Sequence, residues 1–284
     1  LDCSQNDAIT GKRSRDSDGQ RPWIYGENLD GWNKMCSALA GSSITSLNFS
    51  GCQLNSESLN PLTEAIKVMA TVTWVSVLSN PIGDGADALI EIFEKNDKIQ
   101  TLLGLEEGVQ VLDLSNKQMD PGQAKILAAE IRLRRFTATL NSLTVDSTGD
   151  TKDRWGDWRN GGPKPYTLTA GEEKIDLSNK NLGSADVALL TAWLQRPEVI
   201  ATIARLNLSG NLITGSREEW DDDIDDEVWE YDLDLSGLTS LCDALPTLKN
   251  PIQLDLSNCG LSVNGMNEIA KAMSAGATVN SLTI

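Results

Sequence analysis

The residues of this chain most suited to chemistry form an acidic run in its last third. Asp221, Asp223 and Asp225 have the one-three-five spacing of ligands in a calcium-binding loop. Such a loop needs glycine at its sixth position and glutamate at its twelfth, where this chain has Asp226 and Asp232. The spacing therefore does not predict an EF-hand. Three interpretations of the run stay open: a solvated loop, a surface for a basic protein partner, or incidental calcium binding.

The complete acidic run reads SREEWDDDIDDEVWEYDLD at 216–234 and contains eleven acidic residues. Like charges at this density repel one another and favour an extended, solvated loop unless a cation or a basic partner neutralises them. The residues that a basic partner would contact are Trp220, Asp221, Asp222, Asp223, Asp225, Asp226 and Glu227.

Other constellations that support catalysis or cofactor binding are missing from the sequence. The chain has no histidine, which removes the commonest general base and most metal and triad arrangements. Its five cysteines are an odd number without a CxxC pair, so neither a disulfide framework nor a zinc cluster is predicted. The GxGxxA pattern at 83–88 follows an expected strand, but an ordinary strand-to-helix turn accounts for it without any nucleotide. We expect no catalytic residue, no metal and no cofactor.

Charge and hydropathy limit the class of partner. The chain has 24 Lys and Arg against 41 Asp and Glu, a net charge of -17 that repels nucleic acids and anionic membranes. No stretch reaches the roughly 18 apolar residues that a membrane helix needs, and residues 1–20 lack the apolar run of a signal peptide. The chain does not begin with Met, so a processed product and a removed targeting segment stay open, as does the compartment.

A repeated segment predicts the framework of strands that carries the acidic run and the other candidate residues. It reads VQVLDLSNKQM at 109–119 and EEKIDLSNKNL at 172–182, with apolar residues at positions 4 and 6. This alternation predicts a short strand that turns the apolar side chains inward and the residue between them to solvent. Further complete or partial copies begin at residues 44, 72, 140, 203, 251 and 279, with a degenerate copy at 231–238.

Position 9 of the segment is occupied by asparagine in two copies and by cysteine in two others. Asn80 and Asn211 stand there, where an inward amide satisfies backbone groups as the chain leaves the strand. Cys52 and Cys259 occupy the same position, so we expect them to be small buried groups rather than reactive thiols. Position 5 forms a polar column, mostly acidic, made of Asn48, Ser76, Asp113, Thr144, Asp176, Asn207, Asp234 and Asp255.

The recurring segment resembles the leucine-rich repeat, from about residue 31 to the end. Spacings of about 30 residues leave room for one helix per repeat, which is similar to the long-repeat class of ribonuclease inhibitor. The resemblance implies an α/β fold, a leucine-rich repeat solenoid with a curved parallel sheet on its concave face and helices on its convex face. We expect an N-terminal extension over 1–30 and a solenoid over 31–284, interrupted by insertions at about 146–168 and 216–231.

The helices between the strands have recognisable ends. Asp120 before Pro121 predicts an N-cap followed by proline at the first helical position. Ser184 is expected to cap the next helix and Pro197 to stop it. At the front, the helix expected over 32–43 delivers Trp32 onto the first strand as a cap.

These features together predict a non-enzymatic scaffold for protein–protein interaction. A partner would bind the concave face, with Trp74 and Arg205 as candidate contacts, and the two insertions, with Trp155 and Trp158 in the first. Two alternatives stay open. The chain is a structural subunit of a large assembly, with its neighbours at the ends and insertions, or it regulates an enzyme as an inhibitor or activator, a role that rests on the resemblance alone. The sequence stops at Ile284 within a copy of the strand, so we expect the natural chain to continue or another subunit to cover that end.

Overall fold

The computed structural model describes residues 1–13, 24–135, 137–152, 157–221 and 226–284. Over these residues it is a mixed α/β structure with eight α-helices and several parallel β-sheets. The chain divides into two compact units. Unit 1 consists of Leu1–Val109 and Lys117–Thr139, and unit 2 of Gln110–Asn116 and Leu140–Ile284. The division into an extension over 1–30 and one repeat region over 31–284 stays a prediction.

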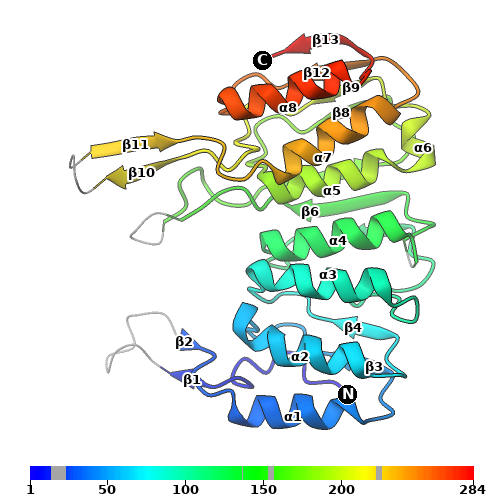
Figure 1. Cartoon of the computed structure of the whole chain (residues 1–284), viewed down its shortest axis with the longest axis vertical. Coiled ribbons are helices and arrows are strands. Elements are labelled where there is room, and N and C mark those ends of the chain that lie inside the picture. The colour runs from blue at the N-terminus through cyan, green and yellow to red at the C-terminus, as the bar shows by residue number, and fades with distance from the viewer. Residues whose placement is uncertain (14–23, 136, 153–156, 222–225) are drawn as a thin grey trace. The chain divides into compact units, whose positions relative to one another are not determined.

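Unit 1 alternates short strands with helices. Its helices cover one face of the parallel pair β3–β4 (Figure 1). The elements are β1 (Lys12–Arg13), β2 (Ile24–Tyr25), α1 (Asp30–Ala40), β3 (Ser46–Asn48), α2 (Ser56–Val68), β4 (Trp74–Ser76), the 3-10 turn η1 (Gly83–Gly85), α3 (Ala86–Lys95) and α4 (Pro121–Leu133).

The front of unit 1 is closed by α1 and by the first residues of the chain. Trp32 of α1 is buried, and its ring meets Phe49 edge to face at 5.2 Å between centroids. Residues 1–5 run beside β3, where Cys3 donates its N–H to the Asn48 carbonyl and Gln5 donates to the Ser50 carbonyl. The expected helical cap over Trp32 is therefore confirmed. The N-terminal segment adds a second cover, because it pairs with the strand edge that would otherwise be open.

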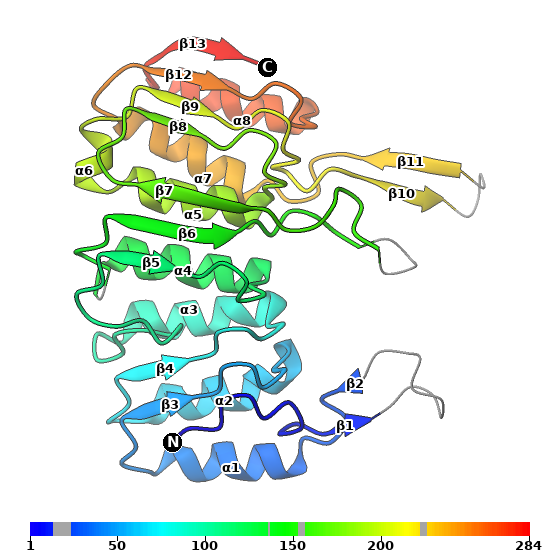
Figure 2. The same ribbon diagram turned by 180° about the vertical axis from the view of Figure 1, so that it is seen from behind.

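Unit 2 contains two larger sheets. Strands β5, β6 and β7 form one, with β5–β6 parallel and β6–β7 antiparallel, and the other has the order β13-β12-β9-β8, all parallel (Figure 2). The elements are β5 (Val111–Asp113), β6 (Ser142–Asp146), β7 (Pro165–Thr169), β8 (Lys174–Asp176), α5 (Ser184–Leu194), α6 (Pro197–Ile200), β9 (Arg205–Asn207), β10 (Arg217–Asp221), β11 (Asp226–Glu230), α7 (Ser236–Ala244), the 3-10 turn η2 (Leu245–Thr247), β12 (Ile252–Asp255), α8 (Val263–Ser274) and β13 (Val279–Thr283).

The repeated segment builds these strands as predicted. In six copies the apolar residue at position 4 is buried, and its removal from water is the main driving force for packing each strand on its helix. These residues are Leu47, Val75, Leu143, Ile175, Leu206 and Leu254.

The asparagines at position 9 satisfy the backbone as expected. Asn211 accepts the N–H groups of Lys180 and Leu182 and donates to the carbonyls of Leu177 and Leu208. Asn80 has the same role in unit 1, where it accepts from the Leu54 N–H. Cys52 and Cys259 are buried, so their predicted packing role is confirmed.

Three local predictions were wrong. The 231–238 copy forms no strand, because β12 pairs directly with β9, and Asp234 instead precedes α7. The acidic run forms an antiparallel hairpin of β10 and β11 rather than the extended, solvated loop that its charge density favours. Gly183, one residue before Ser184, is the N-cap of α5.

Candidate interaction surface

The face of the β8–β9–β12–β13 sheet that the helices leave uncovered presents two polar rows (Figure 2). We call these eight residues the open face of unit 2. Strand register aligns Lys174, Arg205, Gln253 and Ser281 in one row, and Asp176, Asn207, Asp255 and Thr283 in the other. The apolar residues between the rows point into the core, so each strand contributes one member to each row.

Charges on the open face are arranged in pairs. Lys174 Nζ lies 2.9 Å from an Asp176 carboxylate oxygen, and this bond holds the pKa of Asp176 below its ordinary value. Arg205 Nε donates to Gln253 Oε1 at 2.8 Å. Arg205, a predicted contact residue, is exposed. Its hydrogen bond to Gln253 on the neighbouring strand orients the remaining guanidinium donors. The face offers donors and acceptors for a partner's polar groups.

On the corresponding face of unit 1, Trp74 and Ser76 of β4 are covered, whereas Ser46 of β3 is exposed. Residues 101–105 bridge to Trp74 and Ser76 of β4, and a side-chain carbon added at Gly104 would lie 2.8 Å from Ser76 and 2.9 Å from Trp74. Trp74 is half-buried and donates its indole N–H to the Leu105 carbonyl. Ser76 is buried. Trp74 thus supports a segment of its own unit, and the role as a partner contact predicted for it stays untested.

The first insertion presents Trp158 on the segment between β6 and β7. The Asp150 carboxylate accepts the backbone N–H groups of Asn160 and Gly162, which fixes the loop around it. Trp158 is 43% exposed, and the Lys152 ammonium lies 5.0 Å from the centroid of its ring. Its predicted neighbour Trp155 lies outside the described residues.

The second insertion contains the other predicted contacts. Trp220 and Asp221 lie in β10, and Asp226 and Glu227 lie in β11, while Asp222, Asp223 and Asp225 lie outside the described residues. Arg159 of the first insertion donates to the Glu218 carbonyl and pairs with the Glu219 carboxylate, so the two insertions lie side by side within unit 2.

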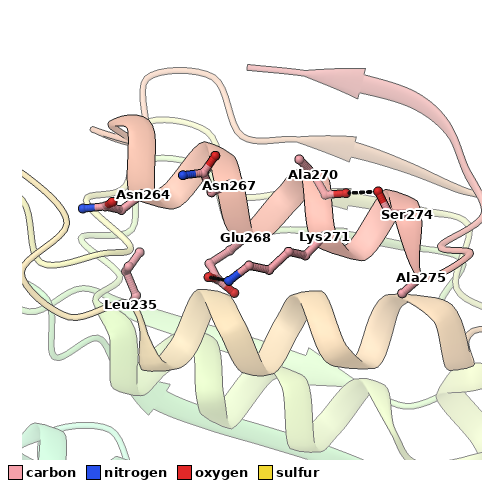
Figure 3. Close-up of a pocket in the computed structure, with 8 residues that line it drawn as sticks. All are labelled: Leu235, Asn264, Asn267, Glu268, Ala270, Lys271, Ser274 and Ala275. Carbon is pink, nitrogen blue, oxygen red and sulfur yellow. Dashed lines mark hydrogen bonds and ion pairs between the residues drawn. The ribbon is translucent and has the colours of Figure 1, made fainter.

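A polar groove runs beside α8, with a volume of about 720 Å³. Figure 3 shows Lys271 directed toward Glu268, and the two groups form an ion pair at 2.5 Å. The charges of Lys271 and Glu268 therefore neutralise each other, and none of the other described residues that line the groove is charged.

The turn with the GxGxxA pattern is occupied by the protein itself. Asp120, the N-cap of α4, accepts the Gly83 N–H at 2.6 Å and the Gln123 N–H at 2.9 Å. A side-chain carbon added at Gly122 would lie 2.3 Å from the Gly83 carbonyl. Because α4 packs this closely, the turn binds a carboxylate of its own chain where a nucleotide phosphate would have to lie.

No group of three or more His, Cys, Asp or Glu side chains in the described part of the chain is placed to hold a metal ion. Among the described helices, none has both the length and the apolar character to cross a membrane.

The thiols give a first testable prediction. All five cysteines are free, Cys3 is half-buried, and the other four are buried. Burial raises the pKa of Cys36 to about 12 and that of Cys259 to about 11, so neither forms a thiolate near neutral pH. Iodoacetamide at pH 8 is expected to label Cys3 first in the native protein, and all five sites after unfolding in urea, as read by mass spectrometry. Rapid native labelling of Cys259 would contradict the packing role.

No protein-family model matches this chain, and no curated protein matches it.

Sequence reasoning did not single out two of the exposed aromatic residues. Trp229 in β11 and Tyr231 just after it stack with ring centroids 5.8 Å apart, and each is about half exposed. Their signal was the alternation Trp-Glu-Tyr at 229–231, which charge density in the acidic run obscured.

Proposed function

We propose that this chain is a non-enzymatic scaffold of leucine-rich repeats, of the ribonuclease-inhibitor-like class, that binds another protein. The observation that carries the proposal is the open face of unit 2, with two rows of polar and charged side chains in register across four parallel strands. Helices cover the opposite face of the same sheet, so the rows are available to a partner (Figure 2). The two insertions extend the contact surface with Trp158 and the acidic hairpin.

The repeat assignment is supported by features that recur at the same position. Strands β3, β4, β8 and β12 are each followed by a turn and a helix, and position 9 contributes an inward group that bonds to neighbouring backbone. No single strand with its helix can bury its apolar face alone, so copies must stack on one another.

The open face predicts a specific effect of charge reversal. Lys174→Glu combined with Arg205→Glu is expected to reduce crosslinks to the partner in a native extract by about ten-fold. Two hydrogen-bond donors of the open face are replaced by carboxylates, which repel the acceptor groups of the partner that the donors would bind. Lys271→Glu is the matched control, since Lys271 is an exposed cation on the helical side of unit 2. Quantitative crosslinking mass spectrometry reads both. Equal crosslinking by the two variants would contradict the role of the open face.

A structural subunit of a large assembly is the second candidate. Ile284, which follows the edge strand β13, is exposed, and α8 exposes Val263, Met266 and Met273. Exposed apolar side chains of this kind are typical of surfaces that another chain covers. Crosslinks from β13 and α8 to several stable neighbours would favour this candidate, whereas links from the open face to one dissociable protein would favour the scaffold.

A further inference from the structure

The hairpin of β10 and β11 has two chemically different faces. Residues paired across antiparallel strands project to the same side. Register pairs Arg217 with Glu230, and it pairs Glu218 with Trp229. Arg217, Glu219 and Glu230 therefore share one face, while Glu218 and Trp229 share the other.

The first face is neutralised by pairs within unit 2. Arg217 Nε lies 3.1 Å from the Glu219 carboxylate, and an Arg217 guanidinium nitrogen lies 3.7 Å from the Glu230 carboxylate. Arg159 of the neighbouring loop lies 3.6 Å from Glu219. This part of the face is thus turned toward the first insertion, and the charges of Arg217, Glu219 and Glu230 have partners.

The second face presents aromatic rings. Trp229 and Tyr231 are 45% and 51% exposed, and their rings stack at 24° between planes. Glu218, opposite Trp229, is exposed as well. We call these three residues the aromatic face. Figures 1 and 2 show that the hairpin projects from the body of unit 2.

Folding does not explain the aromatic face. Both rings come from one strand and its continuation, so their stacking does not join β10 to β11. Leaving about half of each ring in water forgoes much of the hydrophobic gain of burial. Exposed Trp and Tyr are the side chains that most often dominate binding energy at protein interfaces.

We propose that the aromatic face binds an arginine-bearing segment of the protein partner, and this inference rests on the proposed function. The guanidinium would stack on the Trp229 and Tyr231 rings and pair with the Glu218 carboxylate. A planar guanidinium suits both contacts better than an ammonium does. The chain already uses this contact internally, since Arg196 lies 4.4 Å from the Trp193 ring centroid and Arg135 lies 4.3 Å from that of Phe93.

Charge complementarity selects a cationic occupant. Between residues 217 and 230 the sequence has nine acidic residues against one arginine. This excess of negative charge attracts a basic segment at long range and repels an acidic one. A nucleic acid is excluded for the same reason.

The test uses the full chain and a fluorescein-labelled peptide of sequence GRGGRGGRG, with lysine and glutamine analogues. Fluorescence anisotropy measures each Kd at low and physiological salt. We expect the arginine peptide to bind at least ten-fold more tightly than the glutamine peptide, with the lysine peptide between them, and added salt to weaken binding. Equal affinity for the arginine and glutamine peptides, or no binding at all, would overturn the proposal.

Variants then locate the site. Trp229→Ala with Tyr231→Ala is expected to weaken arginine-peptide binding by about ten-fold, and Glu218→Gln by about three-fold. Trp229→Phe with Tyr231→Phe retains the ring faces and should keep most of the affinity, which separates recognition from misfolding. Val68→Ala and Glu57→Gln, both at exposed positions on α2, are the matched controls and should change nothing.

Two results keep this inference separate from the proposed function. Unchanged peptide affinity in the Trp229→Ala and Tyr231→Ala double variant would overturn the arginine site, while partner crosslinks through the open face would still support the scaffold. Absence of any crosslinked partner would overturn the scaffold, whatever the peptide titration shows.

Discussion

Replacing Glu130 with alanine is expected to lower the free energy of unfolding by about 3 to 5 kcal/mol. Glu130 lies in α4 and is buried. Its carboxylate accepts the N–H groups of Leu102 at 2.7 Å and Leu103 at 2.9 Å, together with the Thr101 hydroxyl at 3.1 Å. Alanine would leave buried donors unpaired and open a cavity beside them. Urea unfolding followed by circular dichroism measures the loss.

Loss of Glu130 should also release the segment over β4. Residues 101–105 cover Trp74 and Ser76, and the Glu130 carboxylate is the side chain that holds the backbone at 102 and 103. Hydrogen exchange of these amides should therefore rise in Glu130→Ala, more than exchange in α1. Unchanged protection at 102 and 103 would contradict this role.

Glu130 also predicts a dependence of stability on pH. Burial raises its pKa to about 7 from the ordinary value of 4.5, although hydrogen bonds from Leu102 and Leu103 act in the opposite direction. Between these values the folded state holds one proton more than the unfolded state. The stabilisation is fully present below about pH 4.5 and is lost as pH rises through about 7, a difference of about 3 kcal/mol.

Glu130→Gln isolates this effect. The amide oxygen can accept from the backbone, and the amide N–H can donate to the Thr101 hydroxyl, which accepts as well as donates. We expect the difference in unfolding free energy between wild type and Glu130→Gln to shift by about 2.5 kcal/mol in favour of the variant from pH 5 to pH 8. Glu64→Gln, at an exposed position on α2, is the control and should show no such shift. A difference in unfolding free energy that stays constant between pH 5 and pH 8 would contradict the prediction.

Asp186→Ala is expected to have an effect of similar size, about 3 to 5 kcal/mol. Asp186 is buried in the first turn of α5. One carboxylate oxygen accepts the Thr148 N–H, the Thr148 hydroxyl and the Gly183 N–H at 2.9 to 3.0 Å, and the other accepts the Tyr166 hydroxyl at 3.0 Å. The substitution removes all four bonds at the root of the first insertion.

The same junction is tightly packed, which limits its ability to adjust. A side-chain carbon added at Gly149 would lie 2.2 Å from the Gly183 nitrogen. Water therefore has little room to replace the lost carboxylate. Tyr166→Phe is the matched control, because it removes only one of the four bonds and should cost about 1 kcal/mol. If both variants lost equal stability, the network assigned to Asp186 would be wrong.

Regular, local features of this protein could be predicted from its sequence. Alternating apolar residues predicted the strands. Asn80 and Asn211 were predicted to form hydrogen bonds with the backbone, because the turn after each strand leaves the same backbone N–H and C=O groups unpaired in every copy. Asp120 before Pro121 predicted the start of α4, since a cap depends on residues within one helical turn.

Features that depend on distant residues were not predicted. The hairpin of β10 and β11 was not predicted, because charge density does not define which residues of two strands pair. The degenerate copy at 231–238 matched the strand pattern but lost its place in the sheet to β12. Trp229 and Tyr231 came together only once β11 had formed.

The sequence by itself determined the strand and helix pattern, the inward asparagines and the charge that favours a basic partner. The tertiary structure alone decided which carboxylates are buried. Glu130 and Asp186 look like ordinary helical acids, yet most of their partners lie 20 to 38 residues away in the chain. The periodicity of the sequence predicts the position of a residue within its own strand or helix. Its burial and its hydrogen bonds depend on which residues of the neighbouring segments pack against it in the folded chain.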